Sequence, residues 1–506
     1  MVTEIETTWL QAGLLIMYSL ALGLLLLFSL HRHVLVRLYY KHKDTPRTPK
    51  GSFSSLPRVT IQLPVYNEYY VVERLIRSVA QIDYPSELLE IQVLDDSTDE
   101  TSNLAERVVK ELQVDGQSAV YIHRDSREGF KAGALENGLK MAIGEYVAVF
   151  DADFLAPREF LHETIHYFTD EKVGMVQTRW GHLNRDYSLL TKVQSIFLDG
   201  HFVMEHGARS RAGLFFNFNG TAGIWRKSCI EDAGGWQHDT LTEDLDLSYR
   251  AQMKGWNFAF LEDVVSPAEV PVEMNAWKSQ QFRWSKGSVQ TARKLLGPVL
   301  RSSLTFRVKV EAVIALTANF SYLLMAMVAL LIFPAVLSRL DFGWYRIFVV
   351  DLPLFFAATG AVSRFYIYSQ REVYSDWKTR IKYIPCVLAI GMGISFNNAR
   401  AVIEALVGHQ SAFNRTPKYR VVNQEDKWSE KRYSVKKNVL SFLEVAIGLY
   451  FCWVIAYSIQ NGVYFPVPFL ILFCSGFFYV GWMSLFQGQW ERLRVTSSKV
   501  ETVPAD

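Results

Sequence analysis

Residues 146–154 read YVAVFDADF, a short apolar run that ends in two aspartates, Asp151 and Asp153. Two earlier runs are similar: residues 59–63 read VTIQL and residues 91–94 read IQVL, and a stretch with helical periodicity follows each of them. Strands that alternate with helices are typical of a mostly parallel, doubly wound sheet. Ligands of such sheets bind beyond the carboxyl ends of the strands, so the residues that follow these runs carry most of the information about function.

Acidic residues gather at this predicted edge of the sheet. The first two runs are followed by Pro64, Glu68, Asp95 and Asp96. Asp151 and Asp153 are two positions apart in extended chain, so their side chains point the same way and repel each other unless a cation lies between them. A hard divalent ion held by few protein oxygens and completed by phosphates best explains such a pair. The sequence therefore predicts Mg²⁺ or Mn²⁺ bound together with a nucleotide diphosphate.

The composition of the chain points to a membrane protein with a large polar domain. Half of its 506 residues are hydrophobic and 21% are charged, and the charged residues are largely missing from several long stretches. A net charge of +2 gives no bulk reason to expect nucleic acid as a partner. The four cysteines have no metal-binding spacing, so a disulfide scaffold or zinc module is not expected.

Long apolar runs, uncharged except for Asp351 in the third of them, predict five membrane spans. The runs Trp9–Leu30, Ala312–Ser338 and Ile347–Ser363 give one span each, and Val445–Trp490 gives two that are joined by a hairpin at Ser458–Gly462. Basic residues follow the first run, so residues 32–310 should face the cytoplasm.

A further run, Tyr383–Ala399, carries no charge and has basic segments on both sides. An interfacial or re-entrant helix keeps both flanks in the cytoplasm, and a full sixth span is the alternative. The predicted organisation is a first span at 1–31, a cytoplasmic domain at 32–310 with an interfacial helix near 272–296, two spans at 311–369, a cytoplasmic segment at 370–438, two spans at 439–490 and a tail at 491–506.

Two further motifs lie in the cytoplasmic domain, Thr242–Glu243–Asp244 and Gln280–Gln281–x–Arg283–Trp284. Together with Asp95–Asp96 and Asp151–x–Asp153, they occur in the order and approximate spacing of the processive β-glycan synthases of glycosyltransferase family 2, the cellulose synthase superfamily. The resemblance covers roughly residues 55–420. The wording of QVLDDSTDET, KAGALENGLK, FNFNGTAGIWR and QQFRWSKG is most similar to the cellulose-synthase-like glucomannan and mannan synthases.

This resemblance implies a GT-A-like α/β fold and an inverting, metal-dependent transfer of a hexose from a nucleotide sugar. Asp244 matches the catalytic base. Asp153, with Asp151, matches the metal site. The residues that match nucleotide-binding positions are Pro64, Glu68, Asp95, Asp96, Lys131, Asp151, Gln280 and Arg283.

The resemblance also implies an acceptor site and a gating loop. The acceptor-site candidates are Trp284, Asn219, Gly220, Thr221 and Glu243. Phe413, Thr416 and Lys418 match the loop that closes over the nucleotide in the family, although Arg415 and Pro417 depart from its usual pattern.

Each of these assignments has a purely structural alternative. Asp244 could cap a helix, Lys131 could be a solvated helix residue, and residues 219–221 could form a turn. The segment 280–284 could belong to an amphipathic helix at the membrane interface, and the loop 413–418 could anchor the chain to anionic lipid.

We expect a membrane-embedded enzyme that adds hexose from UDP-glucose or GDP-mannose to a β-1,4-linked polysaccharide and passes the polymer through its own spans. A non-processive enzyme with a lipid acceptor is the alternative, and a transporter with a nucleotide-sensing domain is a second. The expected partners are the sugar donor, a glycan or lipid acceptor and the lipid bilayer, with an accessory or periplasmic subunit left open. A bacterial inner or plasma membrane is favoured over a Golgi membrane.

Overall fold

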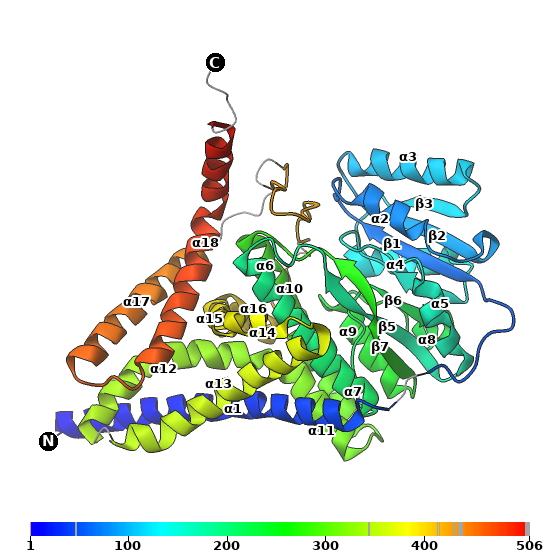
Figure 1. The fold of residues 1–506 in the computed structure, drawn as a ribbon. Helices are drawn as coiled ribbons and strands as arrows, with labels where there is room; N and C mark the ends of the chain where they lie inside the picture. Colours follow the sequence, from blue (N-terminus) through cyan, green and yellow to red (C-terminus); the bar gives the residue numbers. More distant parts are fainter. Residues whose placement is uncertain are drawn as a thin grey trace.

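The computed structural model describes residues 2–45, 48–342, 345–411, 413, 415–428, 431–433 and 439–500. The predicted tail residues 501–506 and Asn414 of the predicted loop lie outside these ranges. Figure 1 shows an α/β domain, built on one sheet, that lies beside a set of long helices.

The sheet has seven strands in the order β3-β2-β1-β4-β6-β5-β7. Neighbouring strands are parallel, except that β6 runs antiparallel to both β4 and β5. The strands are β1 Val59–Val65, β2 Leu89–Asp95, β3 Ala119–His123, β4 Tyr146–Val149, β5 Val173–His182, β6 Gly223–Arg226 and β7 Asn257–Ala268. This mixed, doubly wound sheet is the predicted fold class.

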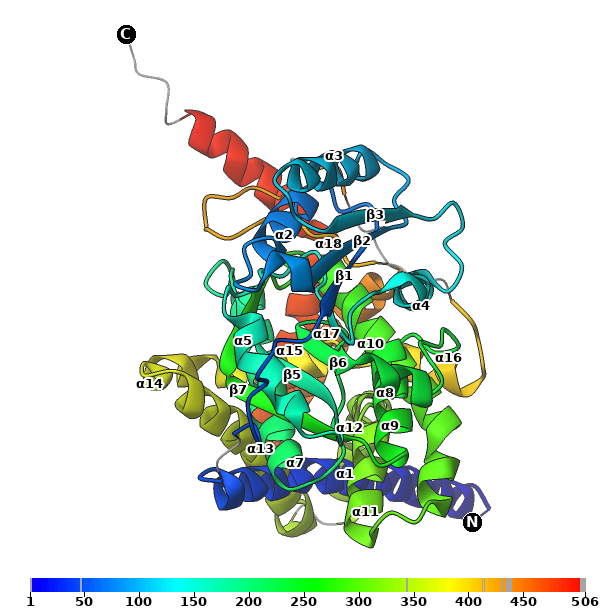
Figure 2. The ribbon, with the colours of Figure 1, turned by 90° about the vertical axis from the view of Figure 1, so that its right-hand side faces the viewer.

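Helices cover both faces of the sheet (Figure 2). The strands at the centre of the sheet are buried along almost their whole length, which explains why their sequences are mostly apolar runs. The helices of this domain are α2 Val72–Val79, α3 Thr101–Val114, α4 Phe130–Met141, α5 Phe160–Ile165, α6 Leu189–Asp199, α7 Gly207–Arg211, α8 Lys227–Asp232 and α9 Glu243–Met253, with the short helices η1 Ser86–Leu88 and η2 His166–Thr169. A π-helix, η3 Gly200–His206, joins α6 to α7.

The helix α10, Met274–Arg301, connects the domain to the long helices. It packs on α9 on one side and on α11, α16 and α18 on the other (Figure 1). The long-helix region comprises α1 Val2–His42, α11 Phe306–Thr317, α12 Phe320–Phe342, α13 Tyr345–Val373, α14 Trp377–Arg380, η4 Ile381–Tyr383, α15 Ile384–Gly393, α16 Ser395–Leu406, α17 Leu440–Gln460 and α18 Val467–Val500. Helix α10 is therefore one of the elements through which the long helices can position groups of the α/β domain; α6, α7 and η3 also pack on long helices.

Three helices within the described residues are long and apolar enough to cross a membrane: Trp9–His42, Leu440–Gln460 and Val467–Gln489. Two bent pairs also pass this test as units. The pair α11 and α12 bends by 54°, and the segment Trp377–Gly393 bends by 42° against α16. Because this second bend falls inside the run Tyr383–Ala399, the re-entrant helix and the sixth span both stay predictions.

Candidate active site

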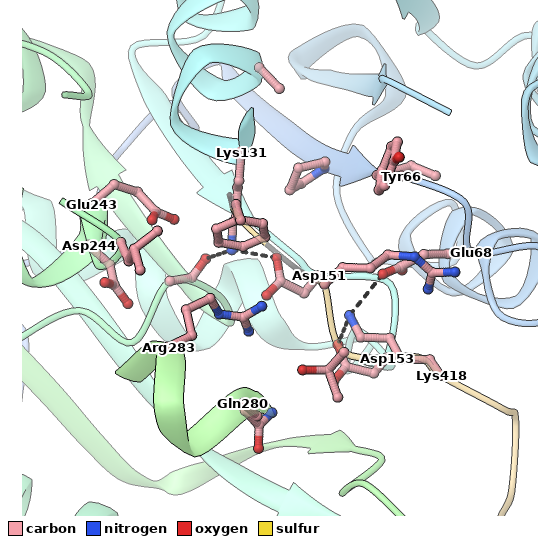
Figure 3. Close-up of a pocket in the computed structure, with 18 of the residues that line it drawn as sticks. Tyr66, Glu68, Lys131, Asp151, Asp153, Glu243, Asp244, Gln280, Arg283 and Lys418 are labelled. Atoms are coloured by element: carbon pink, nitrogen blue, oxygen red, sulfur yellow. Dashed lines mark hydrogen bonds and ion pairs between the residues drawn. The ribbon is translucent and has the colours of Figure 1, made fainter. Parts of the chain in front are cut away.

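A cavity of about 150 Å³ lies at the carboxyl ends of β1, β2 and β4, where the sequence predicts a ligand site. We call it the donor cavity. Figure 3 shows its acidic and basic side chains pointing toward one another. Its lining includes residues from the sheet edge, from α4, from the start of α9, from α10 and from the segment after α16. Parts of the chain that are far apart in sequence therefore build this one site.

Asp151 forms an ion pair with Lys131 on α4. The Lys131 ammonium lies 2.6 Å from the carboxylate and also donates to the Gly220 carbonyl at 2.8 Å. The Asp151 backbone N–H donates to the Thr221 hydroxyl at 2.8 Å, which fixes the chain as it leaves β4. Burial lowers the pKa of Lys131, but the surrounding carboxylates, chiefly Asp151, raise it by more, so the ammonium stays charged.

Asp153 forms its ion pair with Lys418 of the predicted gating loop. The Lys418 ammonium lies 2.8 Å from Asp153 and 3.3 Å from Glu68 (Figure 3). The pKa of Lys418 is lowered by burial but raised more strongly by Asp153 and Glu68, and the net change is upward. Burial raises the pKa of Glu68, and Lys418 opposes that rise. In this structure, two lysines therefore neutralise the two carboxylates of the DxD motif.

The carboxylates fit a hard divalent cation. Carboxylate oxygens are preferred ligands of Mg²⁺ and Mn²⁺. The second oxygen of Glu68 is buried and, within the described residues, has no hydrogen-bond partner. The described residues contain no group of three His, Cys, Asp or Glu side chains that could hold a metal alone. An ion bound by Asp151 and Asp153 would therefore take its remaining ligands from a diphosphate or water.

Asp244 lies at the first turn of α9, on the side of the cavity that faces the long helices. It accepts a hydrogen bond from the Leu245 backbone N–H at 2.8 Å. Burial and the neighbouring Glu243 carboxylate raise the pKa of Asp244 to about 7, and Lys131 opposes that rise. A carboxylate with a pKa near neutrality suits a general base.

Gly220 fits between Asp244 and Lys131 because it has no side chain. Its φ is +80°, and a Cβ at this position would lie 3.0 Å from the Asp244 carboxylate and 3.3 Å from the Lys131 ammonium. Both the left-handed backbone and the close approach favour glycine. A simple surface turn would not need a glycine here, whereas the close approach of Asp244 and Lys131 to the turn at residues 219–221 does.

Gln280, Arg283 and Trp284 reach the donor cavity from α10. The Arg283 guanidinium lies 4.4 Å from the centre of the Phe413 ring, and Phe413 stacks on Phe130 at 5.8 Å. Burial lowers the pKa of Arg283, and Glu243 opposes that change. Phe413, Thr416 and Lys418 all line the cavity, and the gating role of their loop stays a prediction.

Two predicted residues do not line this cavity. Thr221 is buried and holds the Asp151 backbone, as described above. Asp95 is fully buried, and its carboxylate accepts hydrogen bonds from the Ser102 hydroxyl at 2.8 Å and the Tyr121 hydroxyl at 2.7 Å. Asp96 does line the cavity, and it forms a bidentate ion pair with Arg124.

Other lining residues were not predicted. Arg127 lies 3.4 Å from the centre of the Tyr66 ring at the β1 end of the cavity, and Trp180 reaches it from β5. Nothing in the local sequence singles out Trp180. Arg415 also lines the cavity. Its departure from the family's loop pattern is the sequence feature that could have identified it as a site residue.

Comparison with known proteins gives the same picture. Residues 57–287 match the model of a family described as glycosyltransferase like family 2. The chain carries a family 2 glycosyltransferase domain. Its strands β1–β7 and the motifs around Asp151, Asp244 and Arg283 all fall inside the matched residues.

Plant glucomannan 4-β-mannosyltransferases are among the relatives that this chain matches. Enzyme 7 of Arabidopsis thaliana is 38% identical over 269 residues, which cover 52% of this chain and 48% of the relative. Enzyme 1 of Oryza sativa subsp. japonica is 41% identical over 259 residues, which cover 50% of each. The match spans only about half the length of these relatives. The resemblance to cellulose-synthase-like glucomannan synthases is confirmed, and the bacterial membrane stays a prediction.

A solved structure shares the fold of the family 2 domain. The mannosyltransferase PcManGT from Pyrobaculum calidifontis, in complex with GDP-Man and Mn²⁺, matches with a TM-score of 0.51 and 20% sequence identity. The match covers 79% of this chain and all of that protein. It confirms the GT-A-like fold class. The two plant relatives and PcManGT are glycosyltransferases, which is the enzyme class that the sequence predicts.

Proposed function

We propose that this chain is a membrane-embedded inverting glycosyltransferase that moves a hexose from UDP-glucose or GDP-mannose onto a growing β-1,4-linked glycan. One observation carries the proposal. A second cavity of about 500 Å³ extends from the donor cavity into the long helices, and we call it the acceptor cavity. Six residues line both cavities, among them Asp244, Trp284 and Asn219.

The shared boundary is where a sugar would change hands. A donor in the smaller cavity and a glycan end in the larger one would meet at Asp244. As the acceptor hydroxyl oxygen bonds to the anomeric carbon, its proton passes to the Asp244 carboxylate. The bond from that carbon to the phosphate oxygen breaks on the opposite face, and the nucleoside diphosphate leaves with the electron pair. A single displacement of this kind inverts the anomeric carbon.

The donor side supplies positive charge for the leaving group. Lys131 and Arg283 line it, and the nearby Asp151 carboxylate favours the charged form of both side chains. When bound by Asp151 and Asp153, Mg²⁺ or Mn²⁺ would neutralise part of the diphosphate charge. Lys418 already sits on Asp153, so donor binding requires it to release that carboxylate and leaves it placed to contact a phosphate.

The far end of the acceptor cavity suits passage toward a membrane. Near the boundary it is lined by Trp180, Asn219 and Trp284, and farther away by apolar residues of α1, α12, α13 and α18. These include Leu22, Leu25, Met325, Val328, Phe355 and Phe473. A glycan lengthened at the boundary would enter this space.

The decisive experiment uses the full chain purified in detergent. Radiolabelled UDP-glucose and GDP-mannose are supplied separately, each with Mg²⁺ or Mn²⁺, and the product is partitioned between chloroform and hot ethanol. An ethanol-insoluble product that a β-1,4-glucanase or β-1,4-mannanase digests supports the proposal and identifies the donor. A chloroform-soluble label would mean a lipid acceptor, for which the apolar end of the cavity also provides space. A donor that is bound but never consumed would favour a sensing domain.

A further inference from the structure

The end of α10 that carries the motif at residues 280–284 also contains a buried lysine, Lys278, that lines neither cavity. Its side chain is only 3% exposed. The Lys278 ammonium lies 2.7 Å from the carboxylate of Glu444 on α17, whose side chain is fully buried. The hydroxyls of Ser441 and Ser484 lie 3.5 Å and 3.4 Å from the same ammonium. A charged pair thus connects α10 to a helix that is long and apolar enough to cross a membrane.

Further hydrogen bonds hold the same end of α10 against α18. The Asn275 side-chain amide donates to the backbone carbonyl of Ser484 at 2.8 Å. The Gln487 side chain accepts from the Met274 N–H at 2.8 Å and donates to the Val272 carbonyl at 2.7 Å. The start of α10 is therefore attached to α17 and α18, which pack together on the side of the molecule away from the sheet (Figure 1).

The attached residues and the site residues lie on opposite faces of α10. Met274 and Lys278 are four positions apart and so share a face, since a helix turns by about 100° per residue. From that face, Gln280, Arg283 and Trp284 lie about 200°, 140° and 240° around the helix. These three side chains line the donor cavity. A rotation or shift of α10 against α17 and α18 would therefore move all three of them together.

A buried ion pair is suited to fixing the register of two packed helices. Removal of both charges from water offsets much of their attraction, so such a pair adds little to the stability of a fold. Separation of the partners is costly, however, because it leaves an uncompensated charge in the interior. Apolar side chains tolerate small rotations and shifts of a helix far better. The pair of Lys278 and Glu444 therefore favours one position of α10 over its neighbours.

We propose that Glu444 is a positioning residue, which holds Lys278 so that α17 and α18 set the places of Arg283 and Trp284 beside Asp244. Neither Lys278 nor Glu444 lines a cavity, so neither would touch a substrate. This inference rests on the proposed function, because Arg283 and Trp284 act on a diphosphate and an acceptor only in a transferase. It makes the two C-terminal long helices part of the catalytic apparatus.

The test measures transfer per nucleotide-binding site in the full chain in detergent, with radiolabelled UDP-glucose or GDP-mannose as donor. Glu444→Gln keeps the shape of the side chain but removes the charge that holds Lys278. Turnover per site should fall about tenfold to a hundredfold, the loss expected when reacting groups are displaced by about 1 Å. Nucleotide affinity should change little, because Asp96, Lys131 and the DxD carboxylates come from other elements. Counting the sites removes any loss that is due only to unfolded protein.

The partition of the donor between acceptor and water gives a second readout, which does not depend on how much protein is folded. When Trp284 no longer places the acceptor at Asp244, water can replace it. The water oxygen then bonds to the anomeric carbon, its proton passes to Asp244, and the nucleoside diphosphate leaves with the electron pair of the broken bond. The ratio of free hexose to transferred hexose should therefore rise in Glu444→Gln. Lys278→Gln should raise it equally, and the double variant should lose no more turnover than either single variant.

Glu372→Gln is the matched control. Glu372 is a buried carboxylate on α13 that accepts a hydrogen bond from the Tyr40 hydroxyl at 2.5 Å and pairs with Lys43, so it holds α13 to the end of α1. Its variant should keep the turnover per site and the hydrolysis ratio of the wild type. The positioning role is rejected if Glu444→Gln keeps both values, if only its number of sites falls, or if Glu372→Gln changes both values equally.

Amide hydrogen exchange separates this inference from the proposed function. Residues 274–284 should exchange faster in Glu444→Gln than in the wild type or Glu372→Gln, because an attachment that keeps this end of α10 closed has been weakened. Faster exchange in a chain that consumes neither donor would keep the attachment of α10 and reject the proposed function. Unchanged exchange in Glu444→Gln would reject the positioning role even if the wild type is an active transferase.

Discussion

On the donor side of the site, the carboxylates of Asp151 and Asp153 lie 2.6 Å and 2.8 Å from lysine ammonium groups. At the boundary with the acceptor cavity, Asp244 lies beside another carboxylate, Glu243, and its pKa is raised to about 7. Aspartates in the same pair of connected cavities therefore have two different electrostatic surroundings, one beside a cation and one beside another carboxylate.

This difference in electrostatic surroundings suits the two kinds of carboxylate to different chemical roles. A carboxylate that is paired with a cation stays ionised and can exchange its lysine for a metal and a diphosphate. A carboxylate beside a like charge, partly removed from water, holds a proton near neutral pH and can accept one from a hydroxyl. Each of the following predictions perturbs one side of this comparison.

The largest effect is expected from Asp244→Asn. The amide has nearly the same shape but cannot take the acceptor proton, so transfer should fall by at least about a thousandfold, within the range for loss of a general base. Nucleotide binding should persist and should still depend on Mg²⁺ or Mn²⁺, because Asp151 and Asp153 are untouched. Product formation and equilibrium binding of a labelled nucleotide measure the two properties, and unchanged turnover would remove Asp244 from the mechanism.

Asp153→Ala should affect the other side. It removes the carboxylate that Lys418 holds at 2.8 Å, so nucleotide binding should lose its dependence on the divalent ion. Titration of nucleotide with and without Mn²⁺ measures this. Asp170→Ala is the control, since Asp170 pairs with the exposed Lys50 away from the donor cavity. If binding by the Asp153→Ala chain stays metal-sensitive, the metal ligand is a different residue.

The sequence predicted those site residues that come directly after a strand or belong to a short motif. The runs at residues 59–63, 91–94 and 146–150 lie in or directly after β1, β2 and β4, because buried parallel strands leave a continuous apolar signal. The strand β6 reads GIWR and so has only two apolar residues, Ile224 and Trp225, and β5 and β7 mix polar and apolar positions, so these three strands left no such signal.

Asp95 illustrates the limit within a motif. Adjacent residues of a strand point to opposite faces, so Asp95 and Asp96 cannot both face the same cavity. The structure puts Asp96 on the cavity and Asp95 among Ser102 and Tyr121. The sequence pattern gives the pair but not which member faces the ligand.

Residues brought in by long-range packing were harder to predict. Trp180 reaches the boundary from β5, and His201 and Glu205 reach the acceptor cavity through a π-helix. The extra residue in that turn changes which side chains share a face, and hydrophobic periodicity does not reveal it.

Gly220→Ala should cause an intermediate loss. The added Cβ would approach the Asp244 carboxylate at 3.0 Å, and the φ of +80° is strained for alanine. Transfer should fall about tenfold to a hundredfold, with a modest loss in thermal stability. Gly213→Ala is the matched control, because Gly213 has a φ of +68° with open space around its Cβ position. Equal losses of activity in both variants would mean that backbone strain alone is responsible.

The smallest effect, a displaced pH profile, is expected from Glu243→Gln. Asp244 acts as a base only when it is deprotonated, so transfer by the wild type should decline as the pH falls through about 7. Repulsion from Glu243 contributes to that raised pKa, and its removal should lower the pKa and move the acid limb of kcat/KM to lower pH. Asp232→Asn, which removes a surface carboxylate paired with Lys254, is the control and should leave the limb in place. A limb that stays unmoved in Glu243→Gln would mean that burial alone sets the proton affinity of Asp244, and that the like-charge pair at the boundary is not what distinguishes it from Asp151 and Asp153.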